Sequence, residues 1–391
     1  MTKKFSSETN LPWWKKGVIY QIYPRSFNDT SGNGIGDLKG ISKKISYLSS
    51  LGVDAIWLSP VFTSPMKDMG YDVSNYTDID PLFGDIYDFE KLIEKAKENK
   101  IKVIIDQVLS HSSDAHPFFK LSKSNKNNSK SDWYVWADPK PDGSPPNNWL
   151  SVFGGSAWEW DTGREQYYLH NFLKSQPDFN FHNEDVQKWL LSTVKFWLEK
   201  GVDGFRLDTA NYYFHDKKLR NNPAIKSRAS GKNPYYYQNL KYSINQKDNF
   251  AFLKKLRKLT DEYKETTMIG EISNVELQAK YTANNDKLHM AYSFDLLRDE
   301  FSPKHIRNTV SKFFKETKDG WPTWSFSNHD VVRHLSRWNK TKIDRQKFAK
   351  LTCALLMSLK GTPCIYQGED LGHTQTKIEF DEIKDPPGKK F

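Results

Sequence analysis

The stretch Gly204-Phe205-Arg206-Leu207-Asp208 decides how the rest of this chain is interpreted. Its apolar and charged side chains alternate, and the side chains of a β-strand point alternately to opposite faces. The pattern predicts a buried strand with Arg206 and Asp208 on one face. Because a nearby positive charge favours an ionised carboxyl group, we expect Arg206 to keep Asp208 ionised. Such a pair suits a nucleophile or a base, and it equally suits a structural salt bridge.

Seven further apolar runs resemble this strand and alternate with helical patterns such as that of residues 186–198. With 204–207 included, the predicted strands are 18–23, 55–58, 102–106, 204–207, 268–270, 291–294, 323–326 and 363–366. Alternating strands and helices favour parallel strands joined by right-handed crossovers. Eight such units predict an α/β fold, a (β/α)₈ TIM barrel with its active site at the C-terminal strand ends. A doubly wound open sheet is the alternative, but no glycine-rich phosphate loop follows the first strand.

The connection that follows the third predicted strand is unlike the others. Residues 107–182 are rich in Trp, Asn, Pro and Gly, and a structureless loop of that length would be unusual. We therefore predict an inserted subdomain B over 107–182 and a catalytic barrel over 12–106 and 183–391, with a helix starting near Asn183. No clear eighth helix follows the last strand, so the barrel is predicted to be incomplete at its C-terminus.

Composition narrows the class of protein. The net charge of +10 invites a nucleic-acid interpretation, but the lysines are spread along the chain and no nucleic-acid-binding signature accompanies them. Aromatic residues make up 14% of the chain, and their faces stack on bases, sugar rings or each other. No signal peptide and no run of 18 apolar residues is recognisable, and the two cysteines, Cys353 and Cys364, form no disulfide framework. We expect a cytoplasmic protein with no nucleic-acid or membrane partner, and its oligomeric state stays open.

Polar residues follow several predicted strands directly. They are Asp106, His111, Arg206, Asp208, Glu271, His329 and Asp330. Each could be a helix cap, but their convergence predicts a site at the barrel mouth. Asp208 beside an arginine, and Glu271 after an apolar strand, suit a carboxyl pair with separated pKa values. Retaining glycoside hydrolysis needs such a pair about 5 Å apart, whereas Ser-His-Asp hydrolysis fits less well because no Gly-x-Ser-x-Gly elbow occurs.

These residues resemble the motifs of the α-amylase-type glycoside hydrolases, in particular their bacterial α-glucosidase branch. Residues 106–111 are similar to the first motif of the family, 204–208 to the second, Glu271 to the third and 328–330 to the fourth. Gln176-Pro-Asp-Phe-Asn180 is similar to an extra motif at the end of the inserted subdomain. The resemblance extends from about Trp13 to Gly388.

The resemblance implies a role for each matching residue. Asp208 resembles the nucleophile, Glu271 the general acid/base and Asp330 a third carboxylate that binds sugar hydroxyls. The residues implied to contact the substrate, a small oligosaccharide, are Asp68, Tyr71, His111, Phe153, Phe172, Arg206, Thr209 and His329. For Phe153 and Phe172, core packing is an equal alternative.

By the same resemblance, Thr209 indicates which type of glycosidic bond is cleaved. A valine after the nucleophile goes with α-1,6 cleavage in the family, whereas a threonine or alanine goes with α-1,4 bonds. The expectation is a retaining α-glucosidase for maltose-like substrates. Oligo-1,6-glucosidase, trehalose-phosphate hydrolase and a transglucosylating enzyme are alternatives, and a catalytically silent carbohydrate-binding protein is an alternative of another class.

Residues 29–37, Asp-Thr-Ser-Gly-Asn-Gly-Ile-Gly-Asp, resemble the cation loop of the family. Oxygen ligands separated by glycines suit a hard cation such as Ca²⁺ or Mg²⁺. The implied ligands are Asp29, Ser31, Asn33, Ile35 and Asp37, of which Asp29 and Asp37 carry charge. A structural ion is expected and no organic cofactor, with a metal-free turn as the alternative.

The family normally continues past Phe391 with a last barrel helix, a C-terminal β-sandwich and an arginine that pairs with the residue matching Asp68. We therefore expect a fragment or a shortened chain. An unpaired Asp68 and an uncovered eighth strand would lower stability and weaken the binding of terminal glucose.

Overall fold

Eight parallel strands form the centre of the molecule. The computed structural model describes residues 11–226, 232–340 and 343–389. The strands pair in the order β11-β10-β9-β5-β2-β1-β13-β12, and a bridge from Ala291 to Pro322 joins the two edges. Their bounds are β1 (Ile19–Ile22), β2 (Ala55–Leu58), β5 (Lys102–Gln107), β9 (Gly204–Leu207), β10 (Thr267–Ile272), β11 (Met290–Ser293), β12 (Thr323–Trp324) and β13 (Thr362–Tyr366). All eight predicted strands are present, and the predicted (β/α)₈ barrel is confirmed.

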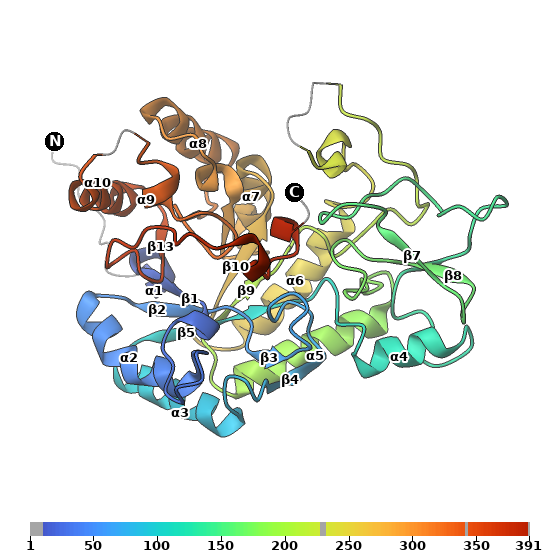
Figure 1. Ribbon diagram of the computed structural model, residues 1–391, viewed down its shortest axis with the longest axis horizontal. Helices are drawn as coiled ribbons and strands as arrows, with labels where there is room; N and C mark the ends of the chain where they lie inside the picture. Colours follow the sequence, from blue (N-terminus) through green and yellow to red (C-terminus); the bar gives the residue numbers. More distant parts are fainter. Residues whose placement is uncertain (1–10, 227–231, 341–342, 390–391) are drawn as a thin grey trace.

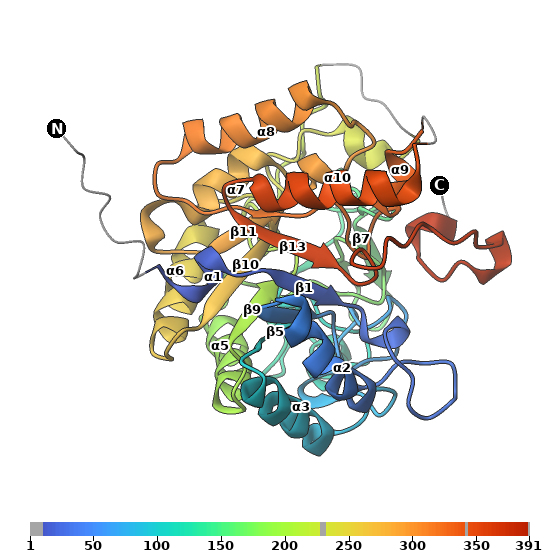
Figure 2. The ribbon, with the colours of Figure 1, turned by 90° about the vertical axis from the view of Figure 1, so that its left-hand side faces the viewer.

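Helices surround this barrel (Figures 1 and 2). They are α1 (Trp13–Lys16), α2 (Leu38–Leu51), α3 (Ile86–Glu98), α5 (Glu184–Glu199), α6 (Asp248–Asp261), α7 (Val275–Thr282), α8 (Pro303–Glu316), α9 (His334–Arg337) and α10 (Arg345–Ser358). Short 3₁₀ turns are η2 (Pro24–Ser26), η4 (Ala283–Asn285), η5 (Phe294–Leu297), η6 (Phe380–Glu382) and η7 (Pro387–Lys389). Helix α5 begins where predicted, because the Asn183 side chain accepts a hydrogen bond from the Asp185 amide and caps it.

The alternation in β9 sorts its side chains between two environments. Phe205 and Leu207 point outward into the core beneath the helices, where both are fully buried. Arg206 points into the barrel, beside Asp106 of the neighbouring strand. Gly204 allows β9 to approach β10 closely, because a Cβ there would lie 2.5 Å from the Thr267 carbonyl oxygen. The sequence of β9 thus brings a charged pair inside the barrel.

Strand β13 is less buried than the strands β1, β2 and β9. Pro363 and Ile365 of β13 are half-buried, whereas every residue of β1, β2 and β9 is buried. Between β13 and residue 389, the regular elements of the described chain are the 3₁₀ turns η6 and η7.

Most of residues 107–182, called the lobe below, extends from the barrel to the right-hand side of Figure 1. Strands β6 (Trp136–Ala137), β8 (Gln166–Leu169) and β7 (Trp158–Asp161) make a small antiparallel sheet in that order, accompanied by α4 (Pro117–Ser124). The sheet shares an apolar cluster of its own that contains Trp149 and Trp158. A second small sheet, β3 (Phe62–Thr63) with β4 (Asn75–Ile79), precedes the lobe in the chain. The predicted domain boundaries stay a prediction.

A second long excursion, between β9 and α6, was not predicted from the sequence. Its described parts contain the 3₁₀ turn η3 (Pro234–Tyr237) and pack against the lobe of residues 107–182. Trp149 Nε1 donates to the Arg220 carbonyl oxygen at 2.9 Å, and Asn148 Nδ2 donates to that of Asn222 at 2.9 Å. Its richness in Asn and Tyr, without helical or strand periodicity, was the available signal.

Candidate active site

One guanidinium group joins three carboxyl groups at the C-terminal ends of β5, β9 and β10. Arg206 Nη1 lies 2.8 Å from Asp106 Oδ1 and 2.7 Å from Asp208 Oδ1, and its Nη2 lies 2.8 Å from Glu271 Oε2. All four residues are buried, with exposed fractions between 1% and 7%. The side chains of Asp208 and Glu271 also interact electrostatically. The two carboxyl groups predicted to act together therefore meet around a common cation.

Thr209 connects this pair to the neighbouring strand end. Its amide donates to Glu271 Oε2 at 2.9 Å, and its hydroxyl donates to Asp208 Oδ2 at 3.3 Å. The same hydroxyl lies 3.0 Å from that of Ser110. A φ of +40° holds Thr209 in a backbone region that β-branched residues rarely adopt. Such strain persists where the surroundings fix it, often at functional sites.

Burial corrects one electrostatic expectation from the sequence. Arg206 lowers the pKa of Asp208, but desolvation outweighs this effect and raises that pKa to about 7. Desolvation also raises the pKa of Glu271 to about 8 and that of Asp106 to about 6. A single guanidinium is shared by three buried carboxyl groups, so it cannot keep all of them ionised.

His329 and Tyr71 line the adjoining wall. Their rings stack at 5.4 Å, and the Tyr71 hydroxyl lies 2.7 Å from His329 Nε2 and 3.0 Å from Asp106 Oδ2. His329 Nε2 also lies 3.3 Å from Asp330 Oδ1. The Asp330 side chain is 38% exposed and is held by Asn328, whose amide donates to its Oδ2 at 2.6 Å. Asp330 thus reaches the site through His329 and faces the open mouth.

Asp68 and His111 meet through Gln176, which was not predicted as a site residue. Gln176 Nε2 donates to Asp68 Oδ2 at 2.7 Å and lies 3.2 Å from His111 Nε2. Asp68 thus accepts a hydrogen bond from a neutral amide, while the expectation that it lacks an arginine partner stays a prediction. Burial raises the pKa of Asp68 to about 7. Gln176 begins the motif 176–180, which was the signal that could have identified it.

Phe172 and Phe153 border the same space from the lobe. The Phe172 ring lies 5.2 Å from that of His111 and 5.5 Å from that of Tyr212, and Phe153 lies 5.6 Å from Phe172. Both phenylalanines are half-buried and line a pocket of about 330 Å³. The aromatic wall therefore continues from the barrel mouth into the lobe.

The loop that resembles a cation site is closed by its own hydrogen bonds. Asp29 accepts from the amides of Ser31, Gly32 and Gly34, and Asn33 Oδ1 accepts from the Ile35 amide. Asp37 caps α2 by accepting from the Gly40 amide at 2.6 Å, and its other oxygen accepts from Thr30. Within the described part of the chain, no group of three or more His, Cys, Asp or Glu side chains is arranged to hold a metal. The predicted ligands thus include only two carboxylates, and the oxygens of both already accept hydrogen bonds. Such a set is poorly suited to hold an ion strongly.

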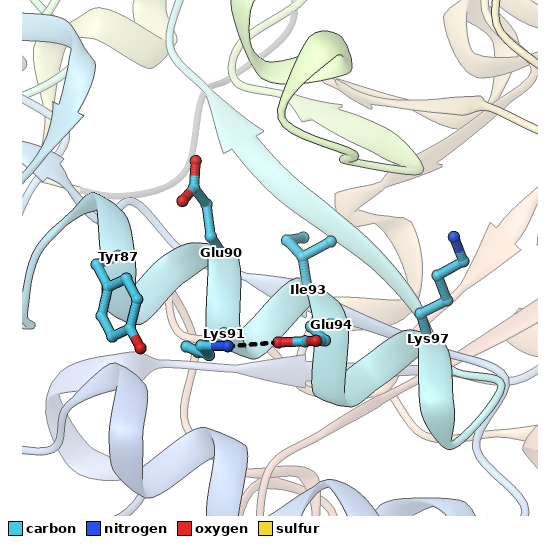
Figure 3. Close-up of a pocket in the computed structure, with 6 residues that line it drawn as sticks. All are labelled: Tyr87, Glu90, Lys91, Ile93, Glu94 and Lys97. Atoms are coloured by element: carbon cyan, nitrogen blue, oxygen red, sulfur yellow. Dashed lines mark hydrogen bonds and ion pairs between the residues drawn. The ribbon is translucent and has the colours of Figure 1, made fainter.

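A second hollow lies on the outer surface of α3, and none of the site residues described above lines it (Figure 3). Lys91 and Glu94 form an ion pair at 2.8 Å, and their side chains are 52% and 60% exposed. Glu90 pairs with Lys200, which directly follows α5. These are the features of a solvated helix surface.

The barrel and the shared-cation carboxyl pair at its mouth define a glycoside hydrolase. The family description "Alpha amylase, catalytic domain" matches residues 21–389, and the chain belongs to that family. No helix within the described ranges has the length and apolar character needed to cross a membrane.

Several relatives are similar along nearly the whole chain. A probable alpha-glucosidase of Rhizobium meliloti (strain 1021) is 52% identical over 395 residues, which cover 98% of this chain and 72% of the relative. An oligo-1,6-glucosidase of Heyndrickxia coagulans is 41% identical, with 95% of this chain and 69% of the relative covered. The crystal structure of the alpha-glucosyl transfer enzyme XgtA superposes with a TM-score of 0.95 at 52% identity, over 98% of this chain and 73% of that structure. The predicted resemblance is confirmed at the level of the family.

Proposed function

We propose that this glycoside hydrolase is a retaining α-glucosidase that releases terminal α-1,4-linked glucose from short oligosaccharides. The observation that carries the proposal is the Arg206 guanidinium, which binds Asp208 at 2.7 Å and Glu271 at 2.8 Å. A shared partner holds the two carboxyl groups near each other, and a short separation is typical of retaining enzymes, whereas inverting enzymes leave room for a water between them. Relatives named as glucosidases support the same class.

The proposed reaction has two displacements. In the first, a carboxylate oxygen of Asp208 attacks the anomeric carbon, while Glu271 gives its proton to the glycosidic oxygen and the leaving group departs as an alcohol. In the second, water attacks the same carbon, Glu271 takes the water's proton, and the bond to Asp208 breaks. The raised pKa of Glu271, about 8, supports its role as the proton donor at neutral pH.

The remaining site residues would hold the glucose unit. Asp68 and His111, joined by Gln176, lie at one end of the site, and this arrangement suits hydrogen bonds to the hydroxyl groups of a terminal sugar. Tyr71 stacks on His329, and Phe172 packs on His111, so apolar ring faces flank the polar groups. Polar edges and apolar faces together suit a pyranose ring.

Product stereochemistry tests this proposal directly. Proton NMR during hydrolysis of an aryl α-glucoside should show α-glucose first, which then mutarotates. Asp208→Asn should abolish glucose release, because the amide is not a nucleophile. Initial release of β-glucose would refute retention. Sugar binding by calorimetry without any turnover would favour the catalytically silent alternative.

The preference for α-1,4 bonds rests on Thr209, whose hydroxyl touches both Asp208 and Ser110. Thr209→Val keeps the branched shape and removes those hydrogen bonds, each typically worth about 1 kcal/mol. We expect the ratio of kcat/KM for maltose to that for isomaltose to fall about tenfold, while Thr209→Ser keeps the ratio near that of the parent. A parent enzyme that already prefers isomaltose would instead support the oligo-1,6-glucosidase alternative.

Glucosyl transfer is a second candidate, favoured by the 52% identity and TM-score of 0.95 to XgtA. In transfer, an alcohol replaces water in the second displacement and the product is a new α-glucoside. Chromatography of reactions with and without added alcohol separates the two outcomes. Transfer products that exceed free glucose at moderate alcohol concentration would assign the chain to this class.

A further inference from the structure

Ser110 lies between two residues of the proposed glucose site, although it was not predicted as a site residue itself. It belongs to the segment that follows β5 and is 2% exposed. Its Oγ lies 2.9 Å from His111 Nδ1 and 3.0 Å from Thr209 Oγ1. Thr209 Oγ1 in turn lies 3.3 Å from Asp208 Oδ2. One buried hydroxyl group therefore connects the histidine to the residue beside the proposed nucleophile.

His111 extends this contact to the end of the site where Asp68 lies. Its Nε2 lies 3.2 Å from Gln176 Nε2, which also donates to Asp68 Oδ2 at 2.7 Å. The Leu173 amide donates to Gln176 Oε1 at 2.9 Å, so the nitrogen of Gln176 is the atom that faces His111. Burial lowers the pKa of His111 to about 4, so near neutral pH the ring carries a single proton. The position of that proton decides in which direction the hydrogen bonds run.

The donors and acceptors around His111 favour a proton on Nδ1. With the proton there, every hydrogen has an acceptor in one chain, which runs from Gln176 through His111, Ser110 and Thr209 to Asp208. With the proton on Nε2, the ring would donate to the Tyr71 carbonyl oxygen at 3.0 Å, and the Gln176 hydrogen that faces Nε2 would have no acceptor. The first arrangement also ends on a carboxyl group, and hydrogen bonds to charged groups are the stronger ones.

We propose that Ser110 is a positioning residue, which joins the glucose-binding end of the site to the nucleophile through this chain of hydrogen bonds. It fixes the proton of His111 on Nδ1, and it directs the Thr209 hydroxyl to Asp208. The hydrogen bond from Thr209 stabilises the carboxylate of Asp208 and orients its Oδ2, while Arg206 holds Oδ1. Neighbouring hydrogen bonds polarise one another, so the loss of one member weakens the bond at the end of the chain. This inference rests on the proposed function and adds to it a residue that acts on the nucleophile through Thr209.

The first test locates the proton of His111 and needs no turnover. ¹⁵N NMR of histidine-labelled parent protein should show a neutral His111 ring with its proton on Nδ1, and the signal is assigned by its absence in His111→Asn. Ser110→Ala removes the acceptor of that proton, so we expect the ring to change to the Nε2 tautomer, which donates to the Tyr71 carbonyl oxygen. Ser112→Ala is the matched control, because it removes another buried hydroxyl group, whose partner Tyr134 lies outside the chain of hydrogen bonds. It should keep the tautomer of the parent.

The second test measures kcat/KM for an aryl α-glucoside as a function of pH. A hydrogen bond to the ionised form lowers a pKa, so a weaker bond to Asp208 raises its pKa and moves the acidic limb of the profile to higher pH. We expect Ser110→Ala to move this limb by about half a pH unit and to lower kcat/KM near neutral pH about fivefold. When Thr209→Val is already present, Ser110→Ala should not move the limb further, since Ser110 acts through the Thr209 hydroxyl. Ser110→Thr keeps the hydroxyl group and should restore the limb, and Ser112→Ala should not move it.

The outcomes separate this inference from the proposed function. If the parent releases no glucose, the proposed function fails, and the role of Ser110 at a nucleophile falls with it. If the parent is active and His111 carries its proton on Nε2, the chain of hydrogen bonds is refuted while the proposed function stands. An acidic limb that Ser110→Ala leaves in place, or moves equally with and without the Thr209 hydroxyl, would show that Ser110 does not act on Asp208 through Thr209.

Discussion

The neighbouring strands β5, β9 and β10 carry an ion network at each end, and the two networks differ in burial. At the C-terminal ends, Arg206 joins Asp106, Asp208 and Glu271, and all four are at most 7% exposed. At the N-terminal ends, Lys102 joins Asp203 at 3.0 Å and Glu265 at 2.9 Å, with side chains 24% to 65% exposed. Each network has more carboxyl groups than cations, so the difference in their behaviour comes from solvent.

That difference shows as opposite pKa shifts. Desolvation raises the pKa of Glu271, whereas the hydrogen bond from Lys102 lowers that of Glu265. Water screens and solvates the excess negative charge at the exposed end, and the buried end has no such compensation. The same strands therefore supply a mildly stabilising network at one end and a costly, reactive one at the other.

The largest expected contrast is in activity. Asp208→Asn should lower kcat/KM for an aryl α-glucoside at least about 10⁴-fold, as removal of a nucleophile does in other enzymes. Asp203→Asn makes the same chemical change five residues earlier, at the exposed end, and should leave kcat/KM within about twofold, since exposed pairs contribute little. Steady-state kinetics of both purified variants measures the contrast. Similar losses in the two variants would show that the effect comes from stability rather than from the nucleophile.

The second prediction concerns the dependence of kcat/KM on pH, which is controlled by the buried network. As pH falls through the pKa of Asp208, about 7, the nucleophile gains a proton and kcat/KM falls. As pH rises through the pKa of Glu271, about 8, the general acid loses its proton and kcat/KM falls again. A narrow bell-shaped profile of kcat/KM is therefore expected, with both limbs belonging to the coupled pair. In Glu271→Gln, assayed with a dinitrophenyl glucoside that needs no protonation, the alkaline limb should disappear. A profile that stays flat between pH 5 and about 9 would contradict the assignment.

Replacing glutamate by glutamine should change the free energy of unfolding in opposite directions in the buried and the exposed ion network. The folded-state pKa of Glu271 is raised, so its stability cost is absent below the unfolded value near pH 4.5 and grows up to about pH 8. Glu271→Gln should therefore stabilise the protein by about 1–2 kcal/mol at pH 8 and much less at pH 5. The folded pKa of Glu265 is lowered, so its contribution is present above the unfolded value and lost as pH falls. Glu265→Gln should destabilise by no more than about 0.5 kcal/mol near neutral pH.

Denaturant titrations of both variants at the two pH values provide these numbers. Destabilisation of Glu271→Gln at pH 8 would mean that the ion pair with Arg206 outweighs the cost of burying the charge.

Chelation is expected to give the smallest effect. The cation loop of residues 29–37 stays a prediction, and its hydrogen bonds to Asp29 and Asp37 hold the turn without requiring an ion. The stabilisation by a bound ion increases with the logarithm of the ratio of its concentration to its Kd, so a weakly bound ion contributes little. EDTA should therefore lower the free energy of unfolding by about 1 kcal/mol or less, and added Ca²⁺ should restore it. Calorimetric unfolding scans with EDTA and with Ca²⁺ measure this. A large loss on chelation, abolished in Asp29→Ala, would show that a tightly bound ion holds the loop.

Much of the barrel could be predicted from the sequence because its strands are short apolar runs with clear boundaries. All eight appear, and β2 and β9 have the predicted bounds. The excursion between β9 and α6 was missed, because its structure depends on hydrogen bonds to the lobe, such as that of Trp149 to Arg220, and these leave no periodic pattern. The role of Gln176 was missed for a similar reason, since its partners Asp68 and His111 lie far away in the chain.

The sequence by itself determined the alternation in residues 204–208, and with it which side chains enter the barrel and which pack beneath the helices. The side of a strand to which a residue points depends on local geometry alone. Only the tertiary structure decided that one arginine serves three buried carboxyl groups, so that burial rather than Arg206 dominates the pKa of Asp208. Desolvation depends on everything that surrounds a group, and those surroundings come from strands and lobes distant in the chain.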